Sequence, residues 1–214
     1  MTWLHHLNDR AFLDVNSFAR HTGWLNTLGA DYATYGVVLF AAMLVAGVVV
    51  SRRRGPATLA AAGWAALATL IAVAVNQPIG RAVAEARPYT AYPHALVLVA
   101  RTSDFAFPSD HSVMAGAVAA GLFLVSRRLG WIATVLAVLL AFARVYVGAH
   151  YPGDVIAGLA LGAAISWLGW LLVRRPLTVV ARWLRGLPGL RQVLVAEPAR
   201  PSTNARQDPS SHLS

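Results

Sequence analysis

The chain has 214 residues, of which 57% are hydrophobic and only 13% are charged, and its mean hydropathy is +0.55. This composition excludes a typical soluble domain and indicates a protein with several membrane spans. The chain contains no cysteine, which excludes disulfides, a thiol nucleophile and a thiolate metal site.

The formal net charge of +9 comes from arginine, because all 18 basic residues are arginines. A nucleic-acid-binding protein would show a basic helix face or basic residues alternating with aromatic ones, and the sequence has neither pattern. The arginines instead form short clusters between apolar runs, at 52–54, 127–128 and 174–175. Such clusters are typical of cytoplasmic anchoring charges, so we expect membrane lipids and no nucleic acid as partners.

The first 30 residues are only weakly apolar. Within them, the stretch DVNSFARHTGWL (14–25) favours an amphipathic or re-entrant helix at the outer membrane interface. The segment lacks the uninterrupted apolar core and small-residue cleavage site of a secretory signal peptide.

Five apolar runs follow, and they predict an all-α, polytopic transmembrane helix bundle. The predicted spans are 33–50, 57–77, 111–126, 130–147 and 154–173. Placing the three arginine clusters in the cytoplasm orients all five spans consistently, with the N-terminus and the connection 78–110 outside.

The region after the last span is more polar. Trp183, between Arg182 and Arg185, suggests a short interfacial helix on the cytoplasmic side. Further on, Pro, Ser and Arg dominate, as in segments that cannot bury a core. We therefore expect an integral membrane domain over residues 1–186 and a disordered cytoplasmic tail over residues 187–214.

Three polar stretches interrupt the apolar pattern: EARPY (85–89), FPSDHS (107–112) and ARVYVGAHYPGD (143–154). Each has a structural interpretation of its own, namely a turn, a helix N-cap at Ser109 and a hydrogen-bonded pair of His150 with Asp154. The predicted topology nevertheless brings all three to the outer side. Ionisable residues at membrane depth are costly and usually mark function, so their coincidence indicates an active site.

The residue types in these stretches suit phosphoryl transfer. Arg87 and Arg144 carry planar charged forks that match phosphate oxygens. The amides at the helix start around Ser109 to His111 form an anion site. Of two histidines, one can attack phosphorus and the other can protonate the leaving oxygen. An aspartate four residues after His150 would lie one helical turn away and could fix the tautomer of its ring.

Other classes of function fit the sequence less well. A transporter or proton relay would use the same ionisable residues, but the sequence shows no internal repeat, and these residues collect at one surface instead of the midplane. A metal hydrolase could use the H-x3-D pair as ligands, but two arginines beside the site would oppose a cation. We therefore expect an enzyme without metal or cofactor.

The three stretches resemble the signature motifs of the type 2 phosphatidic acid phosphatase superfamily. The motif R-x5-H-x3-D is complete as Arg144, His150 and Asp154. The second motif is usually PSGH and here reads PSDH, with Asp110 in the place of glycine. The first usually has a lysine seven residues before the arginine of Arg-Pro, where this chain has Gly80.

Within this superfamily, the PSDH variant, the stretch NQPIGRAVAEARPY (76–89) and the opening DVNSFARHTGWLNTLGADY look like the bacitracin-resistance type of undecaprenyl-diphosphatase. The resemblance spans roughly residues 10–173. It implies that undecaprenyl diphosphate, the spent lipid carrier of cell-wall (peptidoglycan) synthesis, is hydrolysed to undecaprenyl phosphate and phosphate on the outer face of a bacterial plasma membrane. The alternative is another lipid phosphatase, acting on phosphatidylglycerophosphate, phosphatidate or a decaprenyl-linked sugar phosphate.

The resemblance also implies a role for each motif residue. His150 is the nucleophile that forms a phosphohistidine, His111 is the general acid and Asp154 orients His150. The phosphate-binding residues are Arg87, Ser109 and Arg144.

Three further residues are candidates for the same site. Asp110 and Glu85 either manage the leaving group or water of a diphosphate, or balance local charge. Arg81 lies one place from the position of the family's lysine.

Overall fold

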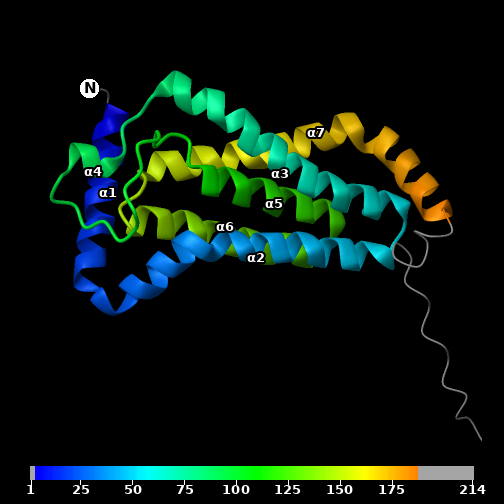
Figure 1. Ribbon diagram of the computed structural model, residues 1–214, viewed down its shortest axis with the longest axis horizontal. Helices are drawn as coiled ribbons and strands as arrows, with labels where there is room; N and C mark the ends of the chain where they lie inside the picture. The colour runs from blue at the N-terminus through cyan, green and yellow to red at the C-terminus, as the bar shows by residue number, and fades with distance from the viewer. Residues whose placement is uncertain (1–2, 188–214) are drawn as a thin grey trace, which may run out of the picture.

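The structure, a computed structural model, describes residues 3–187, and within that range it contains helices and no strand (Figure 1). The helices are α1 (Trp3–His21), the 3-10 helix η1 (Gly23–Leu25), α2 (Asn26–Arg52), α3 (Pro56–Val83), α4 (Pro88–Ala91), α5 (Asp110–Val125), α6 (Arg127–Tyr146) and α7 (Pro152–Gly186). The predicted all-α fold class is confirmed.

Helices α2, α3, α5, α6 and α7 lie side by side as a bundle, and α5 is the most enclosed of them (Figure 1). By length and composition, the segments that contain α2, α3, α6 and α7 can each cross a membrane. α5 has only 16 residues, fewer than the roughly 20 that a lipid-exposed span needs. It packs against α3, α6 and α7, so neighbouring helices enclose it.

All five predicted spans correspond to these helices, although the limits differ. The largest difference is at the C-terminal end, where the span predicted to end at 173 continues in α7 to Gly186. The separate interfacial helix expected around Trp183 is therefore wrong. Pro176 lies inside α7 without ending it. The helix curves towards its C-terminal end in Figure 1, and a proline inside a helix is a known cause of such bending. Of the predicted tail 187–214, all but Leu187 lies outside the described residues.

The predicted N-terminal helix is present as α1, which crosses one end of the bundle (Figure 1). Its Phe12 is fully buried against Tyr92 and Tyr151, with ring centroids 6.0 and 5.5 Å away. The Asn16 side-chain amide exchanges two hydrogen bonds, of 2.8 and 3.0 Å, with the backbone of Leu96. α1 thus fixes both loops that carry residues of the polar stretches.

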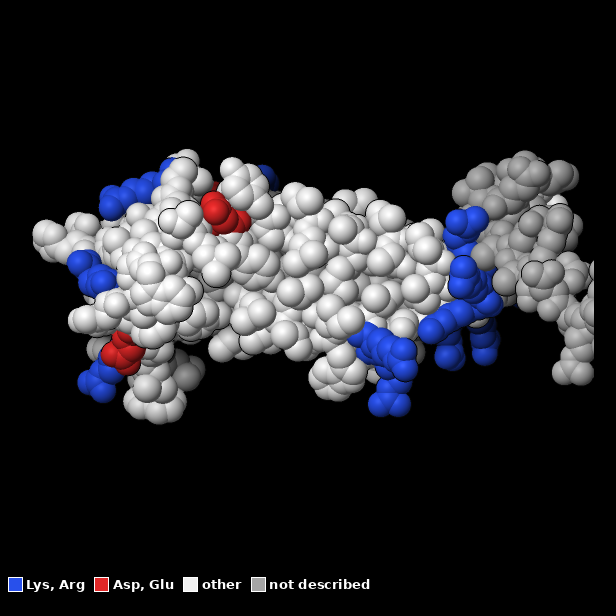
Figure 2. All heavy atoms as spheres, turned by 90° about the horizontal axis from the view of Figure 1, so that it is seen from below, with Lys and Arg blue, Asp and Glu red and all other residues white. Residues whose placement is uncertain are grey.

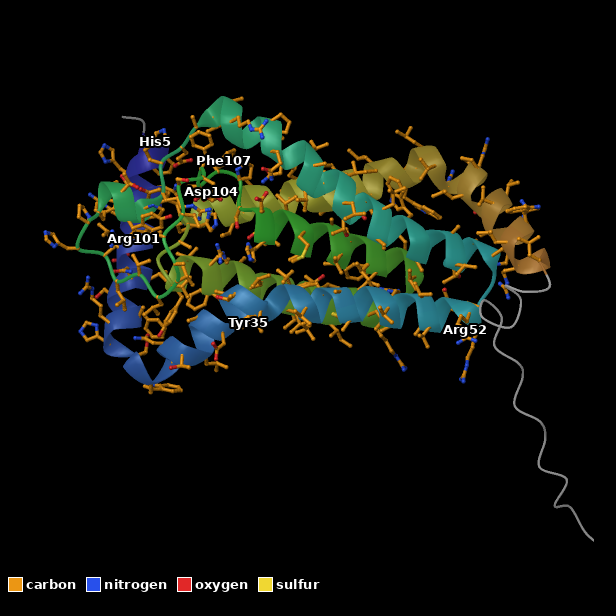
Figure 3. All side chains as sticks on the ribbon, viewed as in Figure 1. His5, Tyr35, Arg52, Arg101, Asp104 and Phe107 are labelled. Carbon is orange, nitrogen blue, oxygen red and sulfur yellow. The ribbon has the colours of Figure 1, made fainter. Side chains whose placement is uncertain are left out.

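Charged residues lie mainly at the two ends of the bundle. On the face shown in Figure 2, arginines lie at both ends, with the larger group at one of them, and the middle of the molecule carries no charge. Figure 3 places Arg52 at that end and Asp104 with Phe107 at the other end, where α1 lies. An uncharged belt between two charged ends is typical of a membrane-spanning bundle.

Candidate active site

A polar cavity of about 280 Å³ lies at the α1 end of the bundle. Its wall contains Arg87, Asp110, His111, Arg144 and His150, which come from all three of the polar stretches. The prediction that these stretches meet at one end of the bundle is therefore confirmed.

His150 lies in the loop between α6 and α7 and is only 2% exposed. Its Nδ1 is 2.9 Å from the carbonyl oxygen of Ala106, and its Nε2 is 3.1 Å from Arg87 Nη1 and 3.4 Å from Arg144 Nη2. A carbonyl only accepts hydrogen bonds and a guanidinium only donates them. Nδ1 therefore carries the proton, and Nε2 presents its lone pair to the two arginines.

The protonation state of His150 follows from its surroundings. Burial lowers the pKa of His150 well below its ordinary value, and the positive charges of Arg144 and Arg87 lower it further. The ring is consequently neutral near pH 7. A neutral imidazole whose Nε2 lone pair lies beside two guanidinium groups is the form that can attack phosphorus.

Asp154 lies next to His150 but not in the way the spacing predicted. α7 begins at Pro152, so His150 precedes the helix and the two residues do not share a helical turn. The Asp154 carboxylate accepts a 2.8 Å hydrogen bond from the Tyr151 N–H, as part of the capping box that begins α7. Its Oδ2 is 3.5 Å from His150 Nδ1, so the carbonyl of Ala106 is the closer partner of this ring.

Arg87 is held by a residue that the sequence did not identify. Asp104 binds its guanidinium at two points, with Oδ1 3.1 Å from Nε and Oδ2 2.9 Å from Nη2. Partial burial alone would raise the pKa of Asp104, but the hydrogen bonds from Arg87 and Thr102 outweigh it and lower the pKa. Nη1 of Arg87 also donates a 3.0 Å hydrogen bond to the Ala149 carbonyl, so the arginine is fixed on both sides.

Arg144 lies in the last turn of α6 and is held from α2, because its Nη1 donates a 3.2 Å hydrogen bond to the Ala33 carbonyl. Its Nε is buried and has no hydrogen-bond partner among residues 3–187. Arg144 therefore lines the cavity and keeps one buried N–H donor without a partner among the described residues.

His111 and Ser109 stand at the start of α5. His111 lines the cavity, and its ring makes no hydrogen bond within the described part of the chain. Ser109 is the N-cap residue, but its Oγ is fully buried, makes no hydrogen bond and does not line the cavity. Its N–H instead donates a 3.1 Å hydrogen bond to the Asp154 carbonyl, which joins the second motif to the third.

The remaining candidates occupy different places. Asp110 lines the cavity, and its Oδ1 accepts hydrogen bonds of 2.7 and 2.9 Å from the amides of Asn76 and Gln77. Arg81 does not line this cavity but a neighbouring one. Glu85 lies in neither, and its electrostatic neighbours include Asp154. Of these three residues, Asp110 is therefore the one that lines the cavity of His150.

Three further groups that hold residues of the site were not predicted from the sequence: two side-chain amides and one backbone carbonyl. Asn76 and Gln77 hold Asp110, and the Ala106 carbonyl holds His150. Asn76 had a usable signal, since it is an amide inside an apolar helix, whereas a backbone carbonyl leaves no trace in the residue types. Over residues 3–187 there is no group of three His, Cys, Asp or Glu side chains arranged to hold a metal ion.

The model of the PAP2 superfamily matches residues 61–177, more than half of the chain. The chain belongs to the PAP2 superfamily. Over 162 residues it is 27% identical to the undecaprenyl-diphosphatase BcrC of Bacillus subtilis (strain 168), covering 76% of this chain and 82% of that protein. Over 124 residues it is 36% identical to the decaprenylphosphoryl-5-phosphoribose phosphatase of Mycobacterium tuberculosis (strain ATCC 25618 / H37Rv), covering 58% and 64%.

The PAP2 fold is also seen in a solved structure. The crystal structure of a transmembrane PAP2 type phosphatidylglycerolphosphate phosphatase from Bacillus subtilis matches with a TM-score of 0.61, covering 78% of this chain and 85% of that chain at 24% identity. The resemblance that the motifs indicated is thus confirmed at the level of the superfamily. This PAP2 protein is a multi-pass membrane protein of a phosphatase family.

Proposed function

We propose that this PAP2 protein hydrolyses undecaprenyl diphosphate to undecaprenyl phosphate and inorganic phosphate. The observation that carries the proposal is the lone pair of His150 Nε2, held beside Arg87 and Arg144 in a cavity that His111 also lines. A fixed nucleophile, two phosphate-binding cations and a second titratable ring are the parts that a phosphoryl transfer through a covalent enzyme intermediate requires.

In the first step, His150 Nε2 attacks the terminal phosphorus and a nitrogen–phosphorus bond forms. The bond from that phosphorus to the bridging oxygen breaks, and the oxygen takes a proton from protonated His111. Arg87 and Arg144 stabilise the charge on the phosphoryl oxygens. The phosphorylated ring keeps its Nδ1 proton and becomes positively charged, which the Ala106 carbonyl and the nearby Asp154 carboxylate stabilise.

In the second step, water attacks the phosphohistidine. The neutral His111 accepts a proton from the water as the new oxygen–phosphorus bond forms. The nitrogen–phosphorus bond breaks, inorganic phosphate leaves and His150 returns to its neutral form. Ser109 acts here as the N-cap residue of α5, and the backbone N–H groups at the start of that helix, together with the helix dipole, favour an anion.

A lipid substrate is supported by an apolar cavity of about 460 Å³. Val37 and Phe40 of α2, Val73 of α3 and Met114 and Val118 of α5 are among the residues of its wall. Thr34, one turn before Val37 on α2, lines the polar cavity that contains His150, which we call the catalytic cavity. A hydrocarbon chain can therefore lie between the helices while its phosphate reaches His150.

The choice of a prenyl diphosphate is supported by the relative BcrC, which matches most of this chain. The PSDH motif supports it as well. Together with this substrate, we propose that the protein resides in the bacterial plasma membrane with its cavity on the outer face. There it would recycle the cell-wall lipid carrier and contribute to bacitracin resistance. The match to a decaprenylphosphoryl-5-phosphoribose phosphatase keeps a lipid-linked monophosphate as the second candidate substrate.

A phosphate-release panel with purified protein in detergent tests the proposal. The substrates are undecaprenyl diphosphate, farnesyl diphosphate, phosphatidylglycerophosphate and phosphatidate, each with and without EDTA. We expect the prenyl diphosphates to give the highest kcat/KM. EDTA should leave this value unchanged, because arginines and not metal ions stabilise the charge on the phosphate oxygens. A preference for phosphatidylglycerophosphate or phosphatidate would show that the substrate is a glycerolipid phosphate and not a prenyl diphosphate. Loss of activity in EDTA that one metal restores would overturn the mechanism.

A further inference from the structure

A second polar cavity, of about 230 Å³, adjoins the catalytic one. Four residues line both cavities, and they lie on the loop before α5 and at its start: Asp104, Phe105, Pro108 and Asp110. The opposite wall comes from the end of α3 and includes Gln77 and Arg81. A ligand group bound at His150 could therefore continue into this second cavity.

The charged groups of this second cavity differ in whether they already have partners. Asp104 is paired with Arg87, and Asp110 accepts hydrogen bonds from two side-chain amides. Arg81 is exposed and makes no hydrogen bond or ion pair with any of residues 3–187. Arg81 is thus the cation of this wall that remains available to an anionic ligand.

Gln77 connects the second cavity to the apolar one between α2, α3 and α5, because it lines both. Three cavities therefore follow one another, the first with the nucleophile and two arginines, the second with Arg81, and the third apolar. A lipid diphosphate presents its parts in the same order: a terminal phosphate, a second phosphate and a hydrocarbon tail.

We propose that the cavity of Arg81 binds the second phosphate of a lipid diphosphate, the one that remains on the lipid, and that Arg81 makes the enzyme prefer diphosphates to monophosphates. This inference rests on the proposed function, since it concerns the leaving group of the same reaction. Arg81 contacts an oxygen of the second phosphate and offsets the negative charge that the leaving group gains when the bridging bond breaks.

Asp110 fits this arrangement although it is negative. Its carboxylate accepts two amide N–H groups and begins α5, where negative charge is favoured. Asp110 directly precedes His111 in the chain, and both residues line the catalytic cavity. His111 is the ring that protonates the bridging oxygen, which lies between the two phosphates.

The test compares farnesyl diphosphate with farnesyl monophosphate, which carry the same tail, in detergent micelles. We expect Arg81→Gln to lower the ratio of kcat/KM for diphosphate over monophosphate by about tenfold, the size of one charge-assisted hydrogen bond. Arg81→Lys should restore part of the ratio, because the charge remains. Arg10→Gln is the matched control, since Arg10 is exposed on α1 and lines neither cavity.

The outcomes separate this inference from the proposed function. If Arg81→Gln lowers kcat/KM equally on both substrates, or leaves the ratio unchanged, Arg81 does not bind the second phosphate, although the enzyme is still a prenyl diphosphatase. If the unaltered protein hydrolyses neither farnesyl compound, the proposed function itself is wrong. Residual monophosphate hydrolysis by Arg81→Gln shows that the variant is folded.

Discussion

The two histidines of the cavity differ in how firmly they are held. His150 is almost completely buried, and neighbours contact both of its ring nitrogens. His111 is partly exposed, and its ring makes no hydrogen bond with residues 3–187. A nucleophile must be aligned with phosphorus before the reaction, whereas an acid must follow the leaving oxygen of the bound substrate. This contrast supports His150 as the nucleophile and His111 as the acid.

These roles predict that the two histidine variants respond differently to the leaving group. His150→Ala removes the covalent route and should abolish hydrolysis of both farnesyl diphosphate and p-nitrophenyl phosphate. His111→Ala should cost about 10²–10⁴-fold on farnesyl diphosphate and much less on p-nitrophenyl phosphate, which departs without a proton. Phosphate release by the two variants measures this. Rescue of His150→Ala, but not of His111→Ala, by the better leaving group would show that the roles are reversed.

Asp104 positions Arg87 and leaves the other edge of its guanidinium to the cavity. We predict that Asp104→Ala lowers kcat/KM by about tenfold, because Arg87 loses its fixed orientation. This is a modest loss, since the Asp104 side chain is 58% exposed. Arg87→Lys cannot form the two-point contact, so adding Asp104→Ala to it should cause little further loss. Losses of kcat/KM that multiply in the double variant would mean that Asp104 acts independently of Arg87.

The sequence therefore identified the residues of the site whose chemistry is local and missed those that depend on folding. His111, Arg144 and His150 belong to motifs with fixed spacing. Asp104 is a single acid in the loop before α5, and its pairing with Arg87 across 17 positions follows from how that loop folds back. The same reason explains why His150 and Asp154 lie side by side without the predicted shared helical turn, because the chain has a capped helix start there.

At the scale of the helices, close packing of α5 against α7 sets the distance between the second and third motifs. A Cβ added at Gly162 of α7 would lie 2.0 Å from the Val113 carbonyl oxygen of α5, and one at Gly158 would lie 2.8 Å from that of Ser109. Glycine is therefore required at these crossings, as it is wherever two membrane helices approach closely. The approximate positions of the spans followed from hydropathy, but these crossings depend on which helices become neighbours and could not be predicted.

This close packing predicts that adding one methyl group at Gly162 lowers both stability and activity. Gly162→Ala should force α5 and α7 apart, lower the melting temperature in detergent and reduce kcat, because His111 and His150 stand on opposite sides of the crossing. Overpacking of this kind costs roughly 1–3 kcal/mol of stability. Gly63→Ala in α3 is the control, because an added Cβ there meets nothing within 4 Å. Equal melting temperatures and activities for both variants would contradict the argument.

At the scale of the whole molecule, the arrangement of charge sets the orientation in the membrane. The arginine clusters at 52–54 and 127–128 lie at helix ends remote from the catalytic cavity, and the cluster at 174–175 lies in the C-terminal half of α7. Figure 2 shows the larger group of arginines at that end of the molecule. Lys and Arg in short loops are retained on the cytoplasmic side. This distribution of arginines supports the proposed orientation, in which the cavity opens on the outer face of the membrane.

The orientation can be tested directly, because the chain has no cysteine of its own. We predict that His94→Cys, exposed in the loop near Tyr92 at the α1 end, reacts with a membrane-impermeant thiol reagent in intact cells. Ala57→Cys, exposed in the first turn of α3 beside the arginine cluster 52–54, should react only after the membrane is permeabilised. Both replacements leave every arginine in place, so they do not alter the charges that determine the topology. The reverse pattern of labelling would place the catalytic cavity in the cytoplasm, and an outer-face role in carrier recycling would then be untenable.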